Sequence, residues 1–487
     1  MPVLLLGLAA AASLAPLADP DLPNHLAMGE WIARHRAVPT VEPFAWTRPG
    51  APYFAYSWLA QTAMYGLLRF GGPLVLHLLA GILLACASGA VLLLGRVEGW
   101  RPWPAFAVAA VHGALAVIST PWLRPQLALW MLVPLAWAAV SAGLRVDRAA
   151  NPRAIVAPLL ALWAIGAVAA GTHILFPITA APLALVVMRT PLPWRRGAAL
   201  AAALGAGWLT SPYAFDWPAV FRLNFTPNAL FGFPSPITEY IPGFIRSAGV
   251  GAVLGLLPWL ALDGRSSWKE RLVYGGLWVV GLIAFGQAVK GLVVWWLVSL
   301  PLAARAAARL PDPSTRMLAS ARATLFLALA ILPGPRMKRS GERVLEGTVA
   351  GRTLPTADGA LAEPAAAWLQ RHLAVGVTGR ALTYANGGSY LVWRLPAISP
   401  SVDARTIFPD SAALPEALRP PGRNAAPLGP WRSADLAIVP TRFPVAAVLD
   451  TATGWRRVPL PDSARVGLWV TERWAERALV PPDTLVD

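Results

Sequence analysis

Long apolar runs alternate with short polar gaps over the first 340 or so residues of the chain. The runs 74–94, 125–144 and 272–289 contain no Asp, Glu, Lys or Arg. A helix needs about 20 apolar residues to cross a hydrocarbon core of about 30 Å. One buried helix of a soluble protein could explain a single such run, but not a long series of them. The pattern therefore predicts an all-α polytopic transmembrane bundle of about eleven spans.

The predicted spans begin at the N-terminus. The first is interpreted as an uncleaved helix because no positive region precedes it, with a cleaved signal peptide as the alternative. After it, 19–72 is predicted to carry two interfacial helices, His25–His35 and Ser57–Phe70, because both have apolar faces at helical spacing. The spans are placed at 3–18, 73–95, 103–119, 125–144, 154–170, 172–188, 197–213, 247–263, 272–289, 291–304 and 318–334.

Charge predicts the orientation. The net charge is +16, and alternate short gaps hold most of the basic residues. The positive-inside rule puts these gaps in the cytoplasm. It therefore puts 19–72, 214–246 and the C-terminal part on the other side of an inner (cytoplasmic) membrane. One cluster disagrees, because Arg336, Lys338 and Arg339 directly follow the last span. If that span does not cross, the C-terminal part lies in the cytoplasm instead.

The composition changes after about residue 340, where apolar runs shorten and acidic residues return. We therefore predict a transmembrane domain at 1–340 and a small α/β or α+β soluble extracytoplasmic domain at 341–487. One helix, Pro364–Leu373, is predicted in the second domain. The predicted strands are Ala381–Tyr384, Ser389–Trp393, Leu436–Val439 and Gly467–Thr471.

Several function classes find no support in the sequence. No P-loop, no G-x-G-x-x-G opening a helix and no spaced Cys/His cluster occurs. The only cysteine, Cys86, cannot form an intramolecular disulfide. The basic residues lie between apolar runs, so topology explains them and nucleic acid is not a predicted partner.

The main candidate for chemistry is the acidic pair Asp19-Pro-Asp21, directly after the first span. Two carboxylates in one turn can share a divalent cation or hold a proton jointly. His25 follows four residues later and faces the same way if a helix has begun by then. Acids and a histidine that are merely solvated at a membrane edge are the alternative explanation.

The wider pattern resembles a known family. The strings Asp19-Pro-Asp-Leu-Pro-Asn-His-Leu, Val38-Pro-Thr-Val-Glu-Pro-Phe and Ser57-Trp-Leu-Ala-Gln61 occur in that order, and further motifs follow downstream. The chain resembles the bacterial multi-spanning C-type (GT-C) glycosyltransferase-like membrane proteins over nearly its whole length. The downstream motifs are Arg124-Pro-Gln126, Thr172-His173, Ser211-Pro-Tyr213, Ile237-Thr-Glu-Tyr240, Gly387-Gly-Ser-Tyr-Leu-Val-Trp393 and Val402-Asp-Ala-Arg405.

The chain also departs from the family pattern. Pro23-Asn24 replaces paired tryptophans, Glu42 stands for Asp, Ser57 stands for Glu and Ala404 stands for Gly. Ser57 therefore removes one carboxylate from the candidate site. This loss leaves the family resemblance intact but puts full activity in doubt.

The resemblance implies a GT-C-like bundle that transfers a hexosyl or pentosyl group with inversion. The donor would be a polyprenyl-phosphate-linked sugar, and the acceptor a glycan, lipid or protein on the extracytoplasmic side. The expected catalytic residues are Asp21, as general base, then Asp19 and Glu239. Asp19 and Asp21 could also hold Mg²⁺ or Mn²⁺. The expected substrate-binding residues are His25, Glu42, Trp58, Arg124, Gln126, His173, Tyr213 and Lys290.

Two other functions compete with this one. A transporter or flippase for lipid-linked glycans would share the spans, but it tends to place ionisable residues at mid-membrane and to show internal repeats. No internal repeat is found here, and the acidic residues cluster at the outer edge of the predicted spans. A catalytically silent membrane scaffold is the third hypothesis, and the missing carboxylate at Ser57 keeps it open.

Overall fold

The structure is a computed structural model. It describes residues 19–119, 123–146, 152–188, 194–230, 255–262, 266–287, 291–309, 359–403, 433–461 and 464–480. Its contacts divide the chain into two compact units. The first, here called the helical unit, comprises 1–15 and 75–340. The second, the mixed unit, comprises 16–74 and 341–487, so the first polar segment groups with the C-terminal part.

Helices make up all regular structure in the described part of the helical unit. Four of them are long and apolar enough to cross a membrane: Trp58–Glu98, Leu127–Arg145, Arg153–Thr172 and Gly291–Ala308. The predicted spans 3–18 and 318–334 lie outside the described residues, so the count of about eleven stays a prediction. The helices are α3 (Trp58–Glu98), α4 (Pro102–Ser119), α5 (Leu127–Arg145), η1 (Pro152–Ile155), α6 (Val156–Thr172), η2 (Phe176–Leu183), α7 (Ala184–Met188), α8 (Trp194–Trp208), α9 (Trp217–Leu230), α12 (Leu257–Ala261), α13 (Trp268–Gln287) and α14 (Gly291–Ala308). The first part of α3, as far as Leu74, belongs to the mixed unit.

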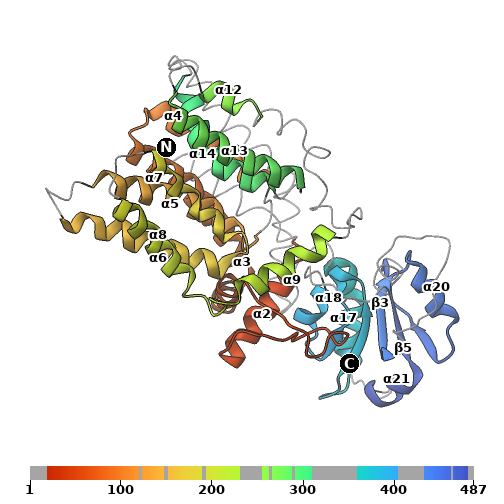
Figure 1. Cartoon of the computed structure of the whole chain (residues 1–487). Coiled ribbons are helices and arrows are strands. Elements are labelled where there is room, and N and C mark those ends of the chain that lie inside the picture. Colours follow the sequence, from red (N-terminus) through yellow and green to blue (C-terminus); the bar gives the residue numbers. More distant parts are fainter. Residues whose placement is uncertain are drawn as a thin grey trace. The chain divides into compact units, whose positions relative to one another are not determined.

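Close helix pairs hold the helical unit together, among them α6 with α8 and α13 with α14 (Figure 1). Small residues allow the first pair to meet. A Cβ on Gly166 would lie 2.4 Å from the carbonyl oxygen of Leu204, and one on Gly207 would lie 2.2 Å from that of Trp163. Glycine at such a crossing lets two backbones approach, as is common between membrane helices.

A kink divides α3. Gly71 and Gly72 have non-helical backbone angles, and Gly72 has a φ of 68°, which favours glycine. The kink coincides with the boundary between the predicted interfacial helix Ser57–Phe70 and the predicted span 73–95. The two segments are therefore one helix interrupted at the glycines.

One expectation for the helical unit was wrong in detail. The segment 172–188 is not one α-helix: His173 is extended, η2 is a 3-10 helix with prolines at 177 and 182, and only α7 is α-helical. Proline removes a backbone donor and so disfavours a regular α-helix there. The segment 214–246, predicted to lie on the side opposite the basic gaps, contains α9 in its described part.

Arginines close helix ends in the helical unit. Four arginines donate to backbone carbonyls in the last turn of a neighbouring helix, where no intrahelical donor is available. A cation is also favourable at that end of the helix dipole. The bonds run from Arg145 to Val97, from Arg196 to Leu144, from Arg101 to Ala308 and from Arg309 to Leu260 and Ala261.

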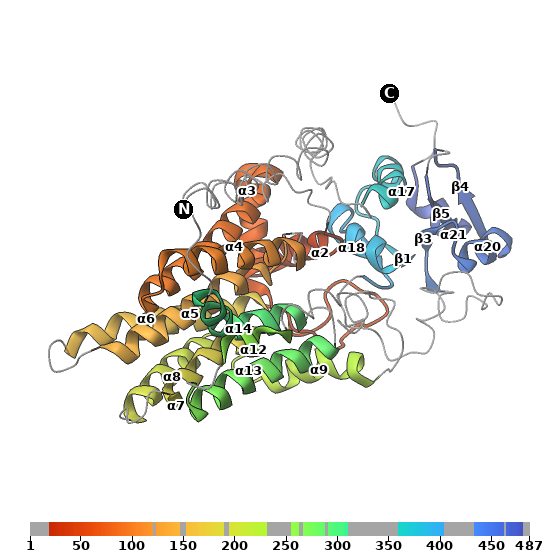
Figure 2. The ribbon, with the colours of Figure 1, turned by 90° about the horizontal axis from the view of Figure 1, so that it is seen from above.

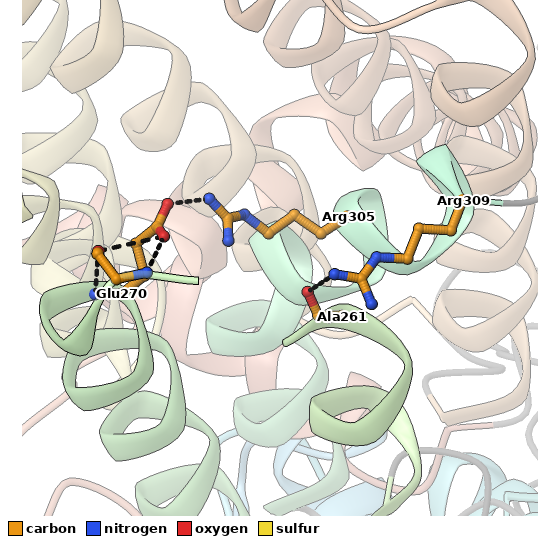
Figure 3. Close-up of polar contacts among 5 residues, drawn as sticks. Ala261, Glu270, Arg305 and Arg309 are labelled. Atoms are coloured by element: carbon orange, nitrogen blue, oxygen red, sulfur yellow. Dashed lines mark hydrogen bonds and ion pairs between the residues drawn. The ribbon is translucent and has the colours of Figure 1, made fainter. Parts of the chain in front are cut away.

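Figure 3 shows two arginines at the C-terminal end of α14, Arg305 within the helix and Arg309 just after it, that connect it to α13 and α12. Arg309 bonds Ala261, and Arg305 pairs with Glu270. Ser267 and Glu270 form a reciprocal cap at the start of α13, with Ser267 N–H donating to Glu270 at 2.9 Å. Burial alone would raise the pKa of Glu270, but the bonds from Ser267 and Arg305 and the charge of Arg305 hold it below its ordinary value.

The mixed unit contains a five-stranded sheet of order β2-β1-β3-β5-β4. β2, β1 and β3 are parallel, whereas β5 runs antiparallel to β3 and β4. In the register, Ala381 of β1 pairs with Leu436 of β3 and Pro400 of β2. The elements are α2 (Leu22–His35), α17 (Gly359–His372), β1 (Gly379–Thr383), α18 (Ala385–Arg394), β2 (Ile398–Pro400), β3 (Leu436–Pro440), α20 (Pro444–Thr451), β4 (Trp455–Val458), β5 (Val466–Thr471) and α21 (Glu472–Ala478).

The two faces of this sheet have separate cores. Leu436 and Ile438 of β3 pack with α17, α18 and α21, while Ala437 and Val439 pack with α20. Figures 1 and 2 show α17 and α20 on opposite sides of the sheet. Trp46, from the first polar segment, packs against the α20 face. That segment therefore supplies part of the core of the C-terminal sheet.

The predicted strand Ser389–Trp393 was wrong, because these residues belong to α18. A short apolar run buried on nearly all sides has no period that separates a strand from a helix. α18 is joined to α17 through Glu363, which accepts bonds from Tyr390 and Arg394. Burial and the negative charge of Glu363 raise the pKa of the Tyr390 hydroxyl.

Candidate functional site

The acidic pair lies at the N-terminus of α2 in the mixed unit. Asp19 is fully buried, and its Oδ1 accepts the backbone N–H of Asp21 at 3.2 Å. Asp21 is the N-cap residue of α2, yet its side chain makes no capping hydrogen bond. The positive end of the helix dipole favours a carboxylate at this place. Both carboxylates are thus held in one turn where negative charge is stabilised.

His25 lies one helical turn after Asp21, and its N–H bonds the Asp21 carbonyl at 3.0 Å. The helix has therefore begun by His25, which is the condition for the two side chains to face the same way. Gln61 Nε2 lies 3.2 Å from His25 Nδ1. If the amide is the donor, the neutral ring carries its proton on Nε2. The role of His25 in substrate binding stays a prediction.

Glu42 and Trp58 have local structural roles in the same unit. Glu42 Oε1 accepts the N–H groups of Phe44 and Ala45 at 2.8 and 3.0 Å, so it holds the turn before Trp46. Trp58 begins α3, and its indole N–H is buried without a hydrogen-bond partner among the described residues. A buried indole N–H usually bonds an acceptor, so the Trp58 N–H is a candidate donor to a bound ligand.

Four other candidates share one end of the helical unit. Arg124 and Gln126 precede α5 and are buried, His173 follows α6, and Tyr213 follows α8. Since Arg196 at the start of α8 bonds Leu144 at the end of α5, the start of α5 and the end of α8 point the opposite way. Arg196, which closes the end of α5, therefore lies at the opposite end of these helices from the four candidates.

An aromatic cluster supports this end of the helical unit. The ring of Phe176, three residues after His173, lies 4.4 Å from Trp217 and 5.2 Å from Trp208. Tyr213 meets Trp217 edge-on at 6.5 Å. Trp217 is buried and is therefore a packing residue of this cluster.

Two predicted site residues are not described. Glu239 and Lys290 lie outside the described residues, so their roles stay predictions. The remaining candidates divide between the two units: Asp19, Asp21, His25, Glu42 and Trp58 in the mixed unit, and Arg124, Gln126, His173 and Tyr213 in the helical unit.

A metal would find few protein ligands here. Within the described ranges, no group of three or more His, Cys, Asp or Glu side chains is arranged to hold a metal ion. Asp19 and Asp21 alone could supply two carboxylates. Mg²⁺ is commonly held by one or two carboxylates together with waters and substrate phosphates, so the pair is compatible with that mode.

Sequence reasoning did not single out two buried amides near the acidic pair, Asn24 in α2 and Gln61 in α3. Asn24 and Gln61 are buried, and Asn24 Oδ1 and Gln61 Oε1 have no hydrogen-bond partner among the described residues. Asn24 Nδ2 donates to Ser389 Oγ at 2.7 Å. Buried unpaired amides are uncommon and costly. Their burial and the lack of a partner for their amide oxygens mark these two residues, and both properties can be seen only in the folded structure.

Solved structures share this architecture. The chain is similar to ArnT from Cupriavidus metallidurans, bound to undecaprenyl phosphate (TM-score 0.55, 16% identity) and in the apo state (TM-score 0.53, 17% identity). Each alignment covers 96% of this chain and 96% of the other. The chain has a GT-C-like fold. With its apolar helices, it is a multi-pass membrane protein. No protein-family model and no curated protein matches it.

Proposed function

We propose that this protein is a membrane glycosyltransferase that transfers a sugar from a polyprenyl-phosphate-linked donor to an acceptor hydroxyl. The observation that carries the proposal is the Asp19–Asp21 turn, held at the N-terminus of α2 within a GT-C-like fold. ArnT, which shares this fold, was solved with undecaprenyl phosphate bound. A carrier of this kind keeps its tail in lipid and its phosphate at the interface.

In the proposed reaction, Asp21 is the general base. Its carboxylate takes the proton of the acceptor hydroxyl as that oxygen attacks the anomeric carbon of the donor sugar. The bond from the anomeric carbon to the phosphate oxygen breaks, and polyprenyl phosphate leaves with the electron pair. A direct displacement of this type inverts the anomeric configuration. Asp19 keeps Asp21 in place by accepting its backbone N–H.

A divalent cation, where one is used, would be held by Asp19 and Asp21 and would neutralise the donor phosphate. Loss of transfer on chelation, restored by Mg²⁺ or Mn²⁺, would assign the metal role. Unchanged transfer in a chelator would leave the carboxylates as base and positioning group.

The proposed orientation places the mixed unit outside the cytoplasm. The arginines that close helix ends, such as Arg145 and Arg196, belong to the predicted cytoplasmic gaps. Arg124, His173 and Tyr213 lie at the opposite end of their helices. The acceptor would therefore be reached from the extracytoplasmic side of the inner membrane.

The test is transfer of labelled sugar from a panel of polyprenyl-phosphate sugars by the purified full-length protein in lipid nanodiscs. Protein-dependent transfer, with release of polyprenyl phosphate, supports the proposal. No transfer from any donor by a folded protein overturns it. Movement of an intact lipid-linked glycan across proteoliposomes, without cleavage of the glycosyl bond, would instead identify a transporter.

A further inference from the structure

A buried polar bond connects α2 to the C-terminal sheet domain. Asn24 Nδ2 donates to Ser389 Oγ at 2.7 Å, across 365 positions of sequence. Asn24 is 3% exposed and Ser389 is fully buried. Loss of this bond would remove the hydrogen bond that the buried Asn24 Nδ2 makes among the described residues, and an unpaired buried amide donor is costly. α2 and α18 also pack directly on each other (Figure 1).

The other side of α2 is held by α3. A Cβ on Gly29 would lie 2.1 Å from the carbonyl oxygen of Gln61, so the two helix backbones are in contact there. One turn earlier, the Gln61 amide lies 3.2 Å from the His25 ring. The first turns of α2 are therefore fixed from two directions, by α3 through Gln61 and by α18 through Ser389.

Ser389 itself is on a firmly anchored helix. A Cβ on the preceding residue, Gly388, would lie 1.8 Å from the carbonyl oxygen of Val402, so only glycine fits. Thr383 at the end of β1 donates to the same carbonyl at 2.9 Å. At the other end of α18, Arg394 bonds Glu363 of α17. A shift of Ser389 would thus disturb the sheet and α17 together.

We propose that Asn24 and Ser389 are a positioning pair through which the C-terminal domain fixes the place of the acidic turn. Asn24 lies three residues after Asp21, in the first turn of α2, so a rotation or slip of that turn would move both carboxylates. The inference rests on the proposed function for its catalytic consequence. Its structural consequence, that residues 19–25 are held in order, is independent of the proposed function.

The test is a double-mutant cycle of Asn24→Ala, Ser389→Ala and the double variant in nanodiscs. Misplacement of a catalytic group by about 1 Å costs up to about 100-fold in rate, so each single variant should lower kcat by about 10- to 100-fold. The kcat of the double variant should be no lower than that of the less active single variant, since both substitutions break the same bond. The KM for the donor should stay unchanged, because the pair is proposed to act on the place of Asp21 and not on the donor.

Thr47→Val is the matched control. Thr47 Oγ1 donates to the Ser401 carbonyl at 2.6 Å, so it joins the same segment to the same domain at a place far along the loop from Asp21. It should lower the thermal midpoint as Asn24→Ala does, with kcat unchanged. An equal loss of kcat in Thr47→Val would overturn the proposal, because general loosening would then explain the effect.

Hydrogen exchange of residues 19–25, measured by mass spectrometry, gives a second readout that needs no activity. Exchange should rise in both single variants and rise no further in the double variant. Unchanged exchange, or unchanged kcat in both single variants, refutes the positioning pair. A wild-type protein that transfers no sugar refutes the proposed function instead, while the exchange data still decide the pair.

Discussion

Replacing Trp46 should loosen the C-terminal sheet in two separable steps. The indole Nε1 donates to the Ala381 carbonyl at 3.1 Å, and the backbone N–H donates to Pro400 at 3.2 Å. Trp46→Phe removes only the first bond. The Ala381 carbonyl also accepts the N–H of Ser401 at 2.7 Å, so it is not left unsatisfied. The cost should therefore be near that of one ordinary hydrogen bond, about 0.5–1.5 kcal/mol.

Trp46→Ala should cost more, because it also removes the ring that packs against the core cluster to which Leu382, Ala437 and Val439 belong. Truncation of a core tryptophan typically costs about 3–5 kcal/mol, and the partial burial of Trp46 favours the lower end of about 3 kcal/mol. Since about 1.4 kcal/mol is a factor of ten, local opening should become about 100-fold more frequent.

The assay is hydrogen exchange of peptides covering β1 and β3 in the nanodisc-embedded protein. Trp46→Phe should speed exchange by about 2- to 10-fold and Trp46→Ala by about 100-fold. Trp163→Ala, at a 45% exposed position on α6, is the control and should leave these peptides unchanged. Wild-type exchange of β1 and β3 in Trp46→Ala would refute the claim that the first segment completes this core.

Two further outcomes follow from other contacts. Gly29→Ala should separate α2 from α3, because its Cβ would overlap the Gln61 carbonyl, and the thermal midpoint should fall clearly. Gly66→Ala is the control: it has open space around its Cβ, so its thermal midpoint should stay unchanged or rise. Glu270 has a lowered pKa, so its pairing with Arg305 stabilises the fold above the ordinary glutamate range and is lost as pH falls through the folded-state pKa. The thermal midpoint should drop over that acidic window in wild type, and Glu270→Gln should flatten this part of the profile.

Apolar periodicity predicted most helices of the helical unit. The predicted span 103–119 corresponds to α4, and 125–144 to α5, since long apolar runs have few alternative structures. The glycine pair at 71–72 was visible in the sequence, but its kink depends on backbone angles that only the structure provides. The apolar residues of 172–188 predicted one regular spanning helix, but the prolines within this segment interrupt it and no continuous α-helix forms.

Long-range docking could not be predicted. The pairing of Asn24 with Ser389, and of Trp46 with β1, joins residues more than 300 positions apart, and no local pattern encodes a partner at that distance. The strand wrongly predicted at Ser389–Trp393 also prevented a prediction of the Asn24–Ser389 bond, because the side chain of Ser389 points in another direction in a strand than in the helix α18. The acidic pair could be proposed as a candidate from the sequence, since carboxylates are rare in such an apolar chain.

The most direct test of the account compares wild type, Asp21→Asn and Glu476→Gln in single-turnover transfer from the donor that the panel identifies. Glu476 is an exposed carboxylate on α21, so its amide variant controls for loss of charge alone. A general base contributes about 10²–10⁴-fold, so Asp21→Asn should lose transfer by about that factor while Glu476→Gln keeps the wild-type rate. Transfer at the wild-type rate in Asp21→Asn would contradict the central claim that the acidic turn on α2 carries the chemistry.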